Sequence, residues 1–439
     1  MKQAPTVILS VGAQQALLPL VTSFVEQAAT CFGLGKEEAL KLTLAAEEVF
    51  MHVCRVITSD GPFEIRCSNG GYYTEAVFSL PPAHSLDMRA FNLTATVAMA
   101  DDTSLEQMGL LIASRSVDRF SFTRNQEGGL QLALIKEKSY PSLPETPPVL
   151  AAPLEKWSLR APDPEESKHI SQLARSYYGT WALSGILLHP GKLADRIKAG
   201  EYRSLAAVGR AGEIAGAIFW HWAGESTLEC SGPYIFNQTR SSAIAEELIE
   251  GCLSAVAKTR AVGIMNTLPT PEFPRRHFER LGTFDVCGQD GSCRPVEAWF
   301  RLLQEDAGCA VWVHSRLEGF VRRECTRLVL PREIRIDQAS GETLPKHSVL
   351  SAEFDRLRAS VTLRAMWPGG DAGENIERHV GLLREEEIRC IYFALDLGEA
   401  WQTVFIPGLL ETGFEPRLVL PYAGHTGDVV MFQLRGKEA

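Results

Sequence analysis

The sequence predicts a multidomain protein that combines α+β and α/β folds, and three observations support this prediction. The chain has 439 residues, more than one hydrophobic core usually organises, so two to four domains are expected. Hydrophobic residues make up 45% and charged residues 22% of the chain, as in folded globular domains. Four prolines within residues 141–148 are incompatible with a helix or a central strand. We therefore expect a first domain at residues 1–140 and a proline-rich linker at residues 141–154.

The first domain alternates between strand and helix signals. Gly33 and Gly35 end an amphipathic helix, and Asn69-Gly70-Gly71 is a strong hairpin turn between two alternating segments. The expected strands are residues 6–10, 63–67, 72–80, 119–122 and 129–136, and the expected helices are residues 15–32, 36–57 and 104–117. This order predicts an α/β sandwich.

Residues 155–305 are expected to form a second domain with a mixed sheet. The expected helices are residues 164–178, 193–199, 242–258 and one that ends at residues 278–282, and the expected strands are residues 204–208, 213–222, 227–235, 261–266 and 296–302. The last hundred residues repeat the end of this order, with helices at 374–386 and 399–412 and strands at 389–395, 417–421 and 428–434. We expect a truncated second lobe at residues 306–439; the alternative interpretation is two unrelated α/β segments.

Charge and cysteine content exclude several classes of protein. The formal net charge of −10 argues against a general nucleic-acid binder, which would present a basic face. The ten cysteines include no Cys-x-x-Cys pair, and the two closest, Cys287 and Cys293, have no histidine ligand nearby. We expect reduced thiols in a cytoplasmic protein, with neither a disulfide framework nor a metal site. No signal peptide and no membrane span are expected.

The helix expected at residues 36–57 carries Glu48 and His52 one turn apart. This stretch resembles the Glu-Glu-x-x-x-Asn helix of GHKL-type ATPases, in the form found in anti-sigma-factor serine kinases. The resemblance implies that Glu48 stands at the general-base position and that His52 replaces the asparagine that binds Mg²⁺. A neutral imidazole is a poor ligand for this hard cation. The alternative interpretation is an exposed charge pair on a helix.

Two further motifs of this family are degraded. Residues 79–82 read Ser-Leu-Pro-Pro, where the family has an Asp-x-Gly box that binds adenine. The family also has a glycine-rich segment followed by an aspartate. From these, this chain retains Gly109 and Asp118. Close approach of phosphate to backbone N–H groups needs residues without a Cβ. We therefore expect an ATPase-like sensor domain that binds neither ATP nor Mg²⁺ and has no kinase activity.

Residues 157–303 resemble a GNAT-type N-acetyltransferase. A hairpin at residues 205–218 matches two strands of that family, and the strand at residues 227–235 precedes its phosphate loop. In the family this loop reads Arg-Gly-x-Gly-Ile-Gly or Ala, and its amides cradle the CoA pyrophosphate. Here residues 240–245 keep small side chains at every glycine position. The resemblance implies that acetyl-CoA or another acyl-CoA is bound by Gln238, Arg240, Ser241, Ser242, Ala243 and Ala245. The alternative interpretation is an ordinary strand-to-helix turn.

Acyl transfer needs a base that deprotonates the amine and a donor for the leaving thiolate. Glu229 and His221 are the candidate bases, although His221 also fits a half-buried strand residue. The family often places a tyrosine where this chain has Phe278, which cannot donate a proton. Tyr234 or Tyr178 is the candidate substitute.

Two functions are compatible with these observations. The first is a regulatory acyl-CoA-dependent N-acetyltransferase-like protein with an inactive ATPase-like domain. The alternative is a non-catalytic, anti-sigma-factor-like regulator that binds a protein of the sigma-factor pathway or another regulatory protein. Sequence leaves the acyl acceptor and the oligomeric state open.

Overall fold

The computed structural model describes residues 5–56, 61–80, 88–95, 102–124, 129–141, 148, 150–179, 181–239, 241–288, 292–337 and 344–436. The chain forms two compact units. The N-terminal unit contains Met1–Tyr140 and Pro345–Ser351, and the C-terminal unit contains Pro141–Leu344 and Ala352–Ala439. The first division falls at the start of the proline-rich segment.

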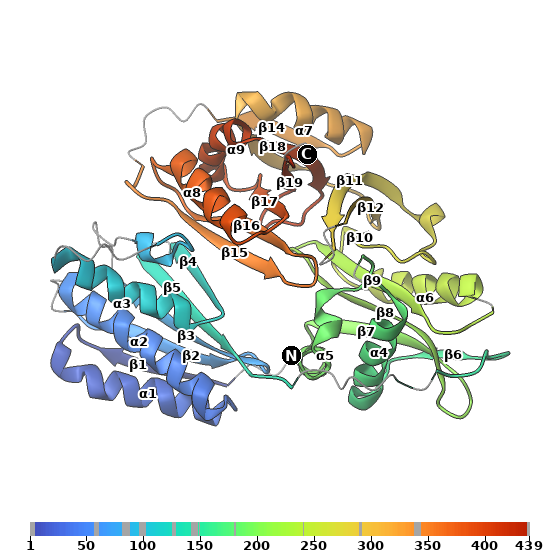
Figure 1. The fold of residues 1–439 in the computed structure, drawn as a ribbon, viewed down its shortest axis with the longest axis horizontal. Coiled ribbons are helices and arrows are strands. Elements are labelled where there is room, and N and C mark those ends of the chain that lie inside the picture. Colours follow the sequence, from blue (N-terminus) through green and yellow to red (C-terminus); the bar gives the residue numbers. More distant parts are fainter. Residues whose placement is uncertain are drawn as a thin grey trace. The chain divides into compact units, whose positions relative to one another are not determined.

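The N-terminal unit is a five-stranded antiparallel sheet with the strand order β1-β2-β3-β5-β4. Its strands are β1 (Thr6–Val11), β2 (Phe63–Asn69), β3 (Tyr73–Leu80), β4 (Arg119–Arg124) and β5 (Leu130–Glu137), and its α-helices are α1 (Leu18–Cys31), α2 (Lys36–Val56) and α3 (Asp102–Ser116). The three helices lie side by side over one face of the sheet (Figure 1). Leu42, Ala45 and Val49 of α2 are buried, as their helical spacing predicts.

The C-terminal unit begins with a seven-stranded sheet of order β11-β12-β10-β9-β8-β7-β6. Its strands are β6 (Ser158–Arg160), β7 (Tyr202–Val208), β8 (Ile214–Trp222), β9 (Thr227–Ile235), β10 (Gly263–Asn266), β11 (Glu279–Cys287) and β12 (Cys293–Leu302). Only β9 and β10 run parallel, and they pair from Thr227 to Glu229. Because β9 continues to Ile235, the two central strands part after Glu229.

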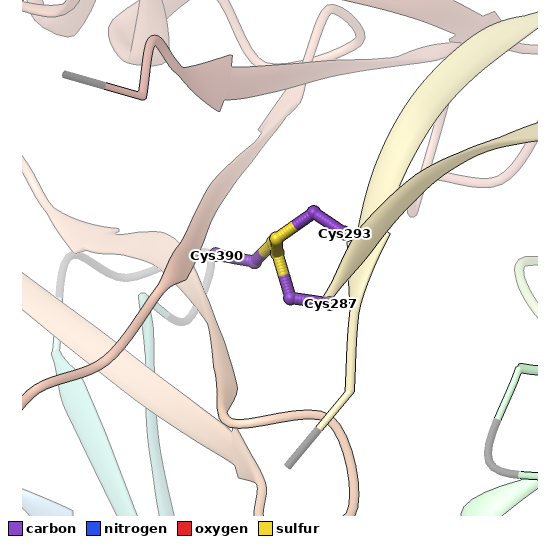
Figure 2. A group of neighbouring side chains, drawn as sticks. All are labelled: Cys287, Cys293 and Cys390. Carbon is purple, nitrogen blue, oxygen red and sulfur yellow. A yellow bond between two sulfur atoms is a disulfide. The ribbon is translucent and has the colours of Figure 1, made fainter. Parts of the chain in front are cut away.

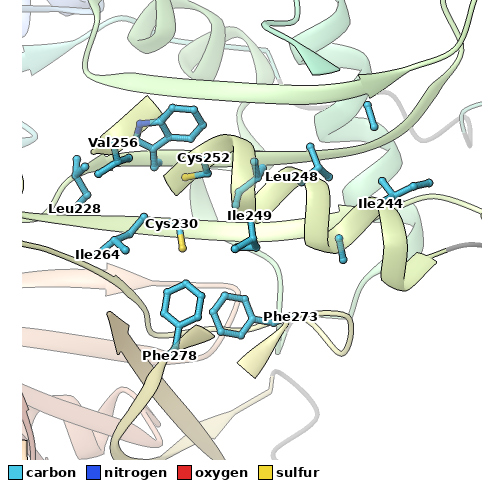
Figure 3. Close-up of a cluster of buried hydrophobic side chains, with 14 of the residues drawn as sticks. Leu228, Cys230, Ile244, Leu248, Ile249, Cys252, Val256, Ile264, Phe273 and Phe278 are labelled. Carbon is cyan, nitrogen blue, oxygen red and sulfur yellow. The ribbon is translucent and has the colours of Figure 1, made fainter. Parts of the chain in front are cut away.

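Helices cover both faces of this sheet. On one face, α6 (Ser241–Val256) buries Ile244, Leu248 and Ile249 against the sheet and against Phe273 and Phe278 (Figure 3). On the other face, α4 (Pro164–Tyr177) and α5 (Pro190–Ala199) pack in a second core cluster. The sheet is therefore the middle of a layered α/β structure.

A second lobe of the same unit repeats part of this topology. Its elements are β13 (Cys309–Val313), α7 (Ser315–Arg327), β14 (Arg332–Ile336), β15 (Val349–Asp355), β16 (Ser360–Trp367), α8 (Ala372–Glu385), β17 (Cys390–Asp396), α9 (Ile406–Thr412), β18 (Phe414–Leu420) and β19 (Val429–Leu434). The strands β13 and β14 form a separate parallel pair. The other five form a sheet of order β15-β16-β17-β19-β18, in which β15 belongs to this unit from Ala352 onward.

This order matches β8-β9-β10-β12-β11 in the first sheet. Both sheets have one central parallel pair, β9 with β10 and β16 with β17, and a helix joins the two strands of each pair. Both edge hairpins also have a register shift, at Arg280/Gly282 and at Pro416/Leu418. The predicted repeat is therefore present in the order of the strands and in the helix that joins each parallel pair. Among the described residues, the second predicted helix occurs only in the second lobe, as α9.

A buried ion cluster holds the second lobe together. The Arg332 guanidinium donates two hydrogen bonds to the Asp428 carboxylate, at 2.7 and 3.1 Å, and one to Asp306 at 2.8 Å. All three side chains are at most 4% exposed. The Thr227 hydroxyl of β9 donates to the carbonyl of Pro421 at 2.7 Å, so the second lobe also packs directly against the first sheet.

Two predictions were wrong. Residues 278–282 do not end a helix, because a short 3₁₀ turn at Arg275–His277 leads straight into β11. The expectation of unpaired thiols also fails at one place, where the structure pairs Cys287 with Cys293 and brings Cys390 beside them (Figure 2). The β11–β12 hairpin places Cys287 opposite Cys293, and β17 brings Cys390 to them from 103 residues away.

Candidate active site

The candidate bases lie where β9 and β10 part. Glu229 is the last residue of β9 that pairs with β10, and Thr267, just beyond β10, donates a hydrogen bond to its carboxylate. His221 of β8 is the register partner of Glu229, with its Nε2 3.9 Å from a carboxylate oxygen. The structure therefore brings together the two residues that the sequence analysis named as bases.

The His221 ring is held by stacking. It lies 4.5 Å from the Tyr202 ring at an interplanar angle of 14°, and the Arg196 guanidinium lies 4.6 Å from the centre of Tyr202. Burial lowers the pKa of His221 below its usual range, while the nearby Glu229 carboxylate acts in the opposite direction. Its Nδ1 is buried and has no hydrogen-bond partner among the described residues. A neutral imidazole beside a carboxylate is suited to accept a proton.

These residues line a cavity of about 630 Å³, a size typical of small-molecule sites. Ser231 of β9, Lys192 of α5 and His189 before it contribute polar groups, and residues 353–357 of the second lobe form part of the wall. Arg358 fixes this wall, because its guanidinium donates hydrogen bonds to the Asp355 carboxylate and to the carbonyl of Leu183. The lining carries both acidic and basic groups, so the cavity fits a small polar ligand.

Side chains cap the edge of β9 beyond the point where the strands part. The Asn266 amide donates to the carbonyl of Gly232 at 2.9 Å, and the Thr270 hydroxyl donates to the carbonyl of Pro233 at 2.8 Å. The Tyr178 hydroxyl accepts a hydrogen bond from the N–H of Ile235 at 2.7 Å. These three side chains satisfy backbone groups that a neighbouring strand would otherwise pair.

A second cavity, of about 870 Å³, lies beside the capped edge. Tyr178 and Thr270 line it together with Glu272, whose carboxylate lies 3.0 Å from the Tyr178 hydroxyl. On another wall, the Arg294 guanidinium lies 4.3 Å from the centre of the Trp181 ring. The capping side chains therefore separate the β9 edge from an open space lined by charged and aromatic side chains.

The predicted acyl-CoA loop is only partly available to a ligand. Arg240 lies outside the described residues. Gln238 accepts a hydrogen bond from the N–H of Leu154 at 2.7 Å, so its amide holds the preceding segment in place. Ser241 opens α6, with Ser242 and Ala243 exposed in its first turn, and Ala245 is buried in the core.

The Tyr234 hydroxyl is hydrogen-bonded to the backbone. It donates to the carbonyl of Ala182 and accepts from the N–H of Ser184, both at 3.1 Å. Burial raises the pKa of Tyr234, and the pKa of Tyr178 is raised by the same cause. Sequence reasoning missed Thr267, Asn266, Thr270 and Tyr202; the only available signal was that the first three follow or end the strand β10.

In the N-terminal unit, α2 and α3 bring Glu48 and Gly109 together, since a Cβ at Gly109 would collide with the Glu48 carboxylate. His52 is 8% exposed, so the alternative of an exposed charge pair is wrong. Burial raises the pKa of Glu48, helped by the neighbouring Glu47. The space beside Gly109 is thus occupied by a carboxylate and not open to a phosphate.

Asp118 stabilises the β4–β5 hairpin. Its carboxylate accepts hydrogen bonds from the Lys136 ammonium at 3.0 Å and from the N–H of Glu137 at 2.7 Å. Residues 81–87, which include the two prolines at the expected adenine position, lie outside the described residues. The GHKL resemblance, the loss of ATP binding and the sigma-pathway partner stay predictions. None of the helices in the described part of the chain combines the length and apolar character that a membrane span requires.

Comparison with known proteins gives matches at the level of structure only. No protein-family model matches the sequence, and a search of curated proteins finds no match. About a third of the chain is similar to solved GNAT acetyltransferases. An aminoglycoside 6'-acetyltransferase type Ii is 16% identical over 34% of this chain and 98% of its own, with a TM-score of 0.26.

Two further acetyltransferase structures contain a bound cofactor. A phosphinothricin acetyltransferase from Sinorhizobium meliloti in complex with AcCoA is 16% identical over 34% of this chain and 89% of its own, with a TM-score of 0.26. A GNAT family N-acetyltransferase from Escherichia coli in complex with CoA is 15% identical over 36% of this chain and 88% of its own, again with a TM-score of 0.26.

Proposed function

We propose that the C-terminal unit is an N-acyltransferase that transfers an acyl group from acyl-CoA to a small polar amine. One observation carries this proposal. The Glu229 carboxylate lies in a ligand-sized cavity, beside a largely neutral His221, at the point where the two central parallel strands part. A base is needed there, because an amine must lose a proton as its nitrogen forms the amide bond.

Each polar residue has a distinct part in this proposal. Glu229 takes the proton of the amine, and Thr267 holds one carboxylate oxygen in place. His221, stacked on Tyr202, accepts the proton from Glu229 or shares it. Residues 353–357 form part of the cavity wall around the pair.

Acyl-CoA would supply a thioester carbonyl to this site. The residues that would hold it are the β9 edge from Gly232 to Ile235 and the first turn of α6 at Ser241 and Ser242. The edge carries three capping hydrogen bonds, so acyl-CoA fits only if Tyr178 and its neighbours move. A hydrogen bond of this kind contributes about 0.5–1.5 kcal/mol net, and the amides of CoA can replace it.

Binding and transfer are tested separately. Calorimetric titration with acetyl-CoA and CoA measures binding, and mass spectrometry of a panel of amines incubated with acetyl-CoA measures transfer. We expect Glu229→Gln to bind acetyl-CoA as the wild type does and to lose about 10²–10⁴-fold in transfer rate. The control is Glu225→Gln, since Glu225 is 56% exposed in the loop between β8 and β9 and its loss leaves the rate unchanged.

The capped edge favours a second candidate, a binding protein without turnover. In that case the His221/Glu229 cavity binds a polar ligand, and the three capping side chains are permanent parts of the fold. Acetyl-CoA and CoA would then bind neither the wild type nor Tyr178→Phe. That result would reject the acyltransferase and support the binding protein.

A further inference from the structure

Three cysteines from distant parts of the chain meet in the C-terminal unit. Cys287 ends β11 and Cys293 begins β12, where the two are register partners. Cys390 begins β17 in the second lobe. Their three sulfur atoms all lie within 4.8 Å of one another (Figure 2). Two separate sheets therefore converge on a single group of thiols.

The valence of sulfur limits what this cluster can be. The Cys287 sulfur lies at bonding distance from the sulfur atoms of both Cys293 and Cys390, but one sulfur atom forms only one disulfide. Any disulfide here therefore leaves a third thiol beside it. When three thiolates coordinate one metal ion, all three cysteines take part. Tetrahedral zinc with Zn–S bonds of about 2.3 Å separates its sulfur ligands by about 3.8 Å. The Cys287 sulfur, which lies at bonding distance from those of Cys293 and Cys390, therefore moves away from both when the three thiolates bind the ion.

The surroundings fit a sheltered metal site with one open side. Cys287 and Cys390 are buried, and they pack with Tyr392, Phe284 and Met431. Buried thiolates need a cation to offset their charge. Cys293 is exposed, so water can reach the side that the three sulfur atoms leave open. Zinc commonly takes water as its fourth ligand beside three protein ligands.

A hydrogen-bonded support holds the strand that carries Cys287. The carbonyl of Asp285 accepts hydrogen bonds from the Tyr392 hydroxyl at 2.6 Å and from the Gln433 amide at 3.0 Å, and the Cys390 Sγ lies 3.6 Å from it. The N–H of Asp285 donates to Gln433 at 2.9 Å. Such contacts orient ligand-bearing strands around metal sites.

We propose that Cys287, Cys293 and Cys390, in their reduced state, bind one zinc ion through three thiolates, with water as the fourth ligand. The ion would join the β11–β12 hairpin to β17. Binding exchanges up to three thiol protons for one Zn²⁺ and releases those protons to solvent. A disulfide form must first take up two electrons and two protons from a reductant, such as a phosphine or a dithiol, to give two thiols.

The test uses the full chain, reduced with a phosphine under anaerobic conditions and titrated with Co²⁺ and then Zn²⁺. We expect one cobalt ion per chain, a thiolate-to-cobalt charge-transfer band and the intense visible bands of tetrahedral cobalt, all removed by zinc. Cys293→Ser should lose most of the charge-transfer band, and because Cys293 is exposed the variant should fold. Cys390→Ser should lose it as well, whereas the control Cys309→Ser, outside the cluster, should keep it.

Alkylation gives a second measurement. With zinc bound, mass mapping should show Cys287, Cys293 and Cys390 protected from iodoacetamide, and a chelator should restore their reactivity. The proposal is overturned if the reduced wild type shows no cobalt band, or if the band persists in Cys293→Ser and in Cys390→Ser. It is also overturned if folded protein keeps a Cys287–Cys293 disulfide through reduction and binds no metal.

Discussion

Replacing Tyr178 with phenylalanine removes one hydroxyl and keeps the ring. The hydroxyl accepts a hydrogen bond from the N–H of Ile235 at 2.7 Å and lies 3.0 Å from the Glu272 carboxylate. Tyr178 and Ile235 are 9% and 2% exposed, so water does not readily replace the lost partner. The substitution therefore leaves a buried backbone donor unpaired at the edge of β9.

The expected cost follows from that unpaired donor. A buried N–H without a partner costs about 1–3 kcal/mol, and a loss of 2 kcal/mol lowers the melting temperature by about 4–8 °C in a domain of this size class. The effect on acyl-CoA has the opposite sign, because the variant has no Tyr178 bond to break. If that bond contributes about 1 kcal/mol net, acetyl-CoA should bind the variant about fivefold more tightly.

Thermal unfolding and calorimetric titration with acetyl-CoA measure these two effects. The matched control is Tyr177→Phe. Tyr177 is 46% exposed, and its ring packs near Tyr178 and Phe236, contacts that phenylalanine preserves. We expect the control to change stability by less than about 0.5 kcal/mol and to leave the affinity for acetyl-CoA unchanged.

One combination of results would refute the reasoning. If Tyr178→Phe is destabilised as expected but binds acetyl-CoA no more tightly than the wild type, then Tyr178 does not compete for the acyl-CoA edge. If the variant is as stable as the control, then the hydrogen bond to Ile235 is not formed in solution.

Three other outcomes follow from buried or perturbed charges. Arg332→Met should lower the free energy of unfolding by about 3–5 kcal/mol, because it leaves two carboxylates buried and unpaired. The control Arg335→Met changes an exposed arginine on the same strand that is paired only at the surface, and it should lower that free energy by at most about 1 kcal/mol. Urea unfolding measures both variants. The hydrogen bond from Arg160 lowers the pKa of Glu166 from 4.5 to about 2, so its stabilising contribution is complete above pH 4.5 and is lost as the pH falls towards 2. An acid-unfolding series should show a shallower slope in Glu166→Gln, and an unchanged slope would contradict this. Burial raises the pKa of Glu48 above 4.5, so the folded state favours the protonated acid and loses stability as the pH rises through that range. Glu48→Gln should therefore raise the melting temperature more at pH 8 than at pH 4, and an equal effect at both would argue against a perturbed carboxyl.

Local sequence patterns predicted much of the fold. The helix expected at residues 36–57 is α2 (Lys36–Val56), and the strand expected at residues 227–235 is β9 (Thr227–Ile235). Periodicity and turn residues are local signals, so they can be interpreted without knowledge of the rest of the chain. The helix expected to end at residues 278–282 failed because Phe278 lies in the core beside Phe273, a contact that apolar spacing alone does not distinguish from a helical face.

The candidate site also contains residues that the sequence predicted and features that it did not. Glu229 and His221 were named from residue type and strand position, and the antiparallel register of β8 and β9 places them opposite each other. No local pattern indicated the wall at residues 353–357, or the capping of the β9 edge by Tyr178. Both require segments more than fifty residues apart to meet. The wall depends on how the two lobes pack, and the capping depends on how the end of α4 packs on β9 within the first lobe.

The sequence alone therefore determined the proline-rich boundary after residue 140, the helices and strands with strong periodicity, the repeated element order near the end of the chain, and the residue types at the base position. Only the tertiary structure decided that Cys390 joins Cys287 and Cys293, and that the edge beside Glu229 is already occupied. The physical reason is the distance along the sequence over which each kind of interaction acts. Secondary structure follows from interactions within a few residues, whereas a thiol cluster or a capped strand edge exists only after distant strands have been brought into contact by the burial of their apolar faces.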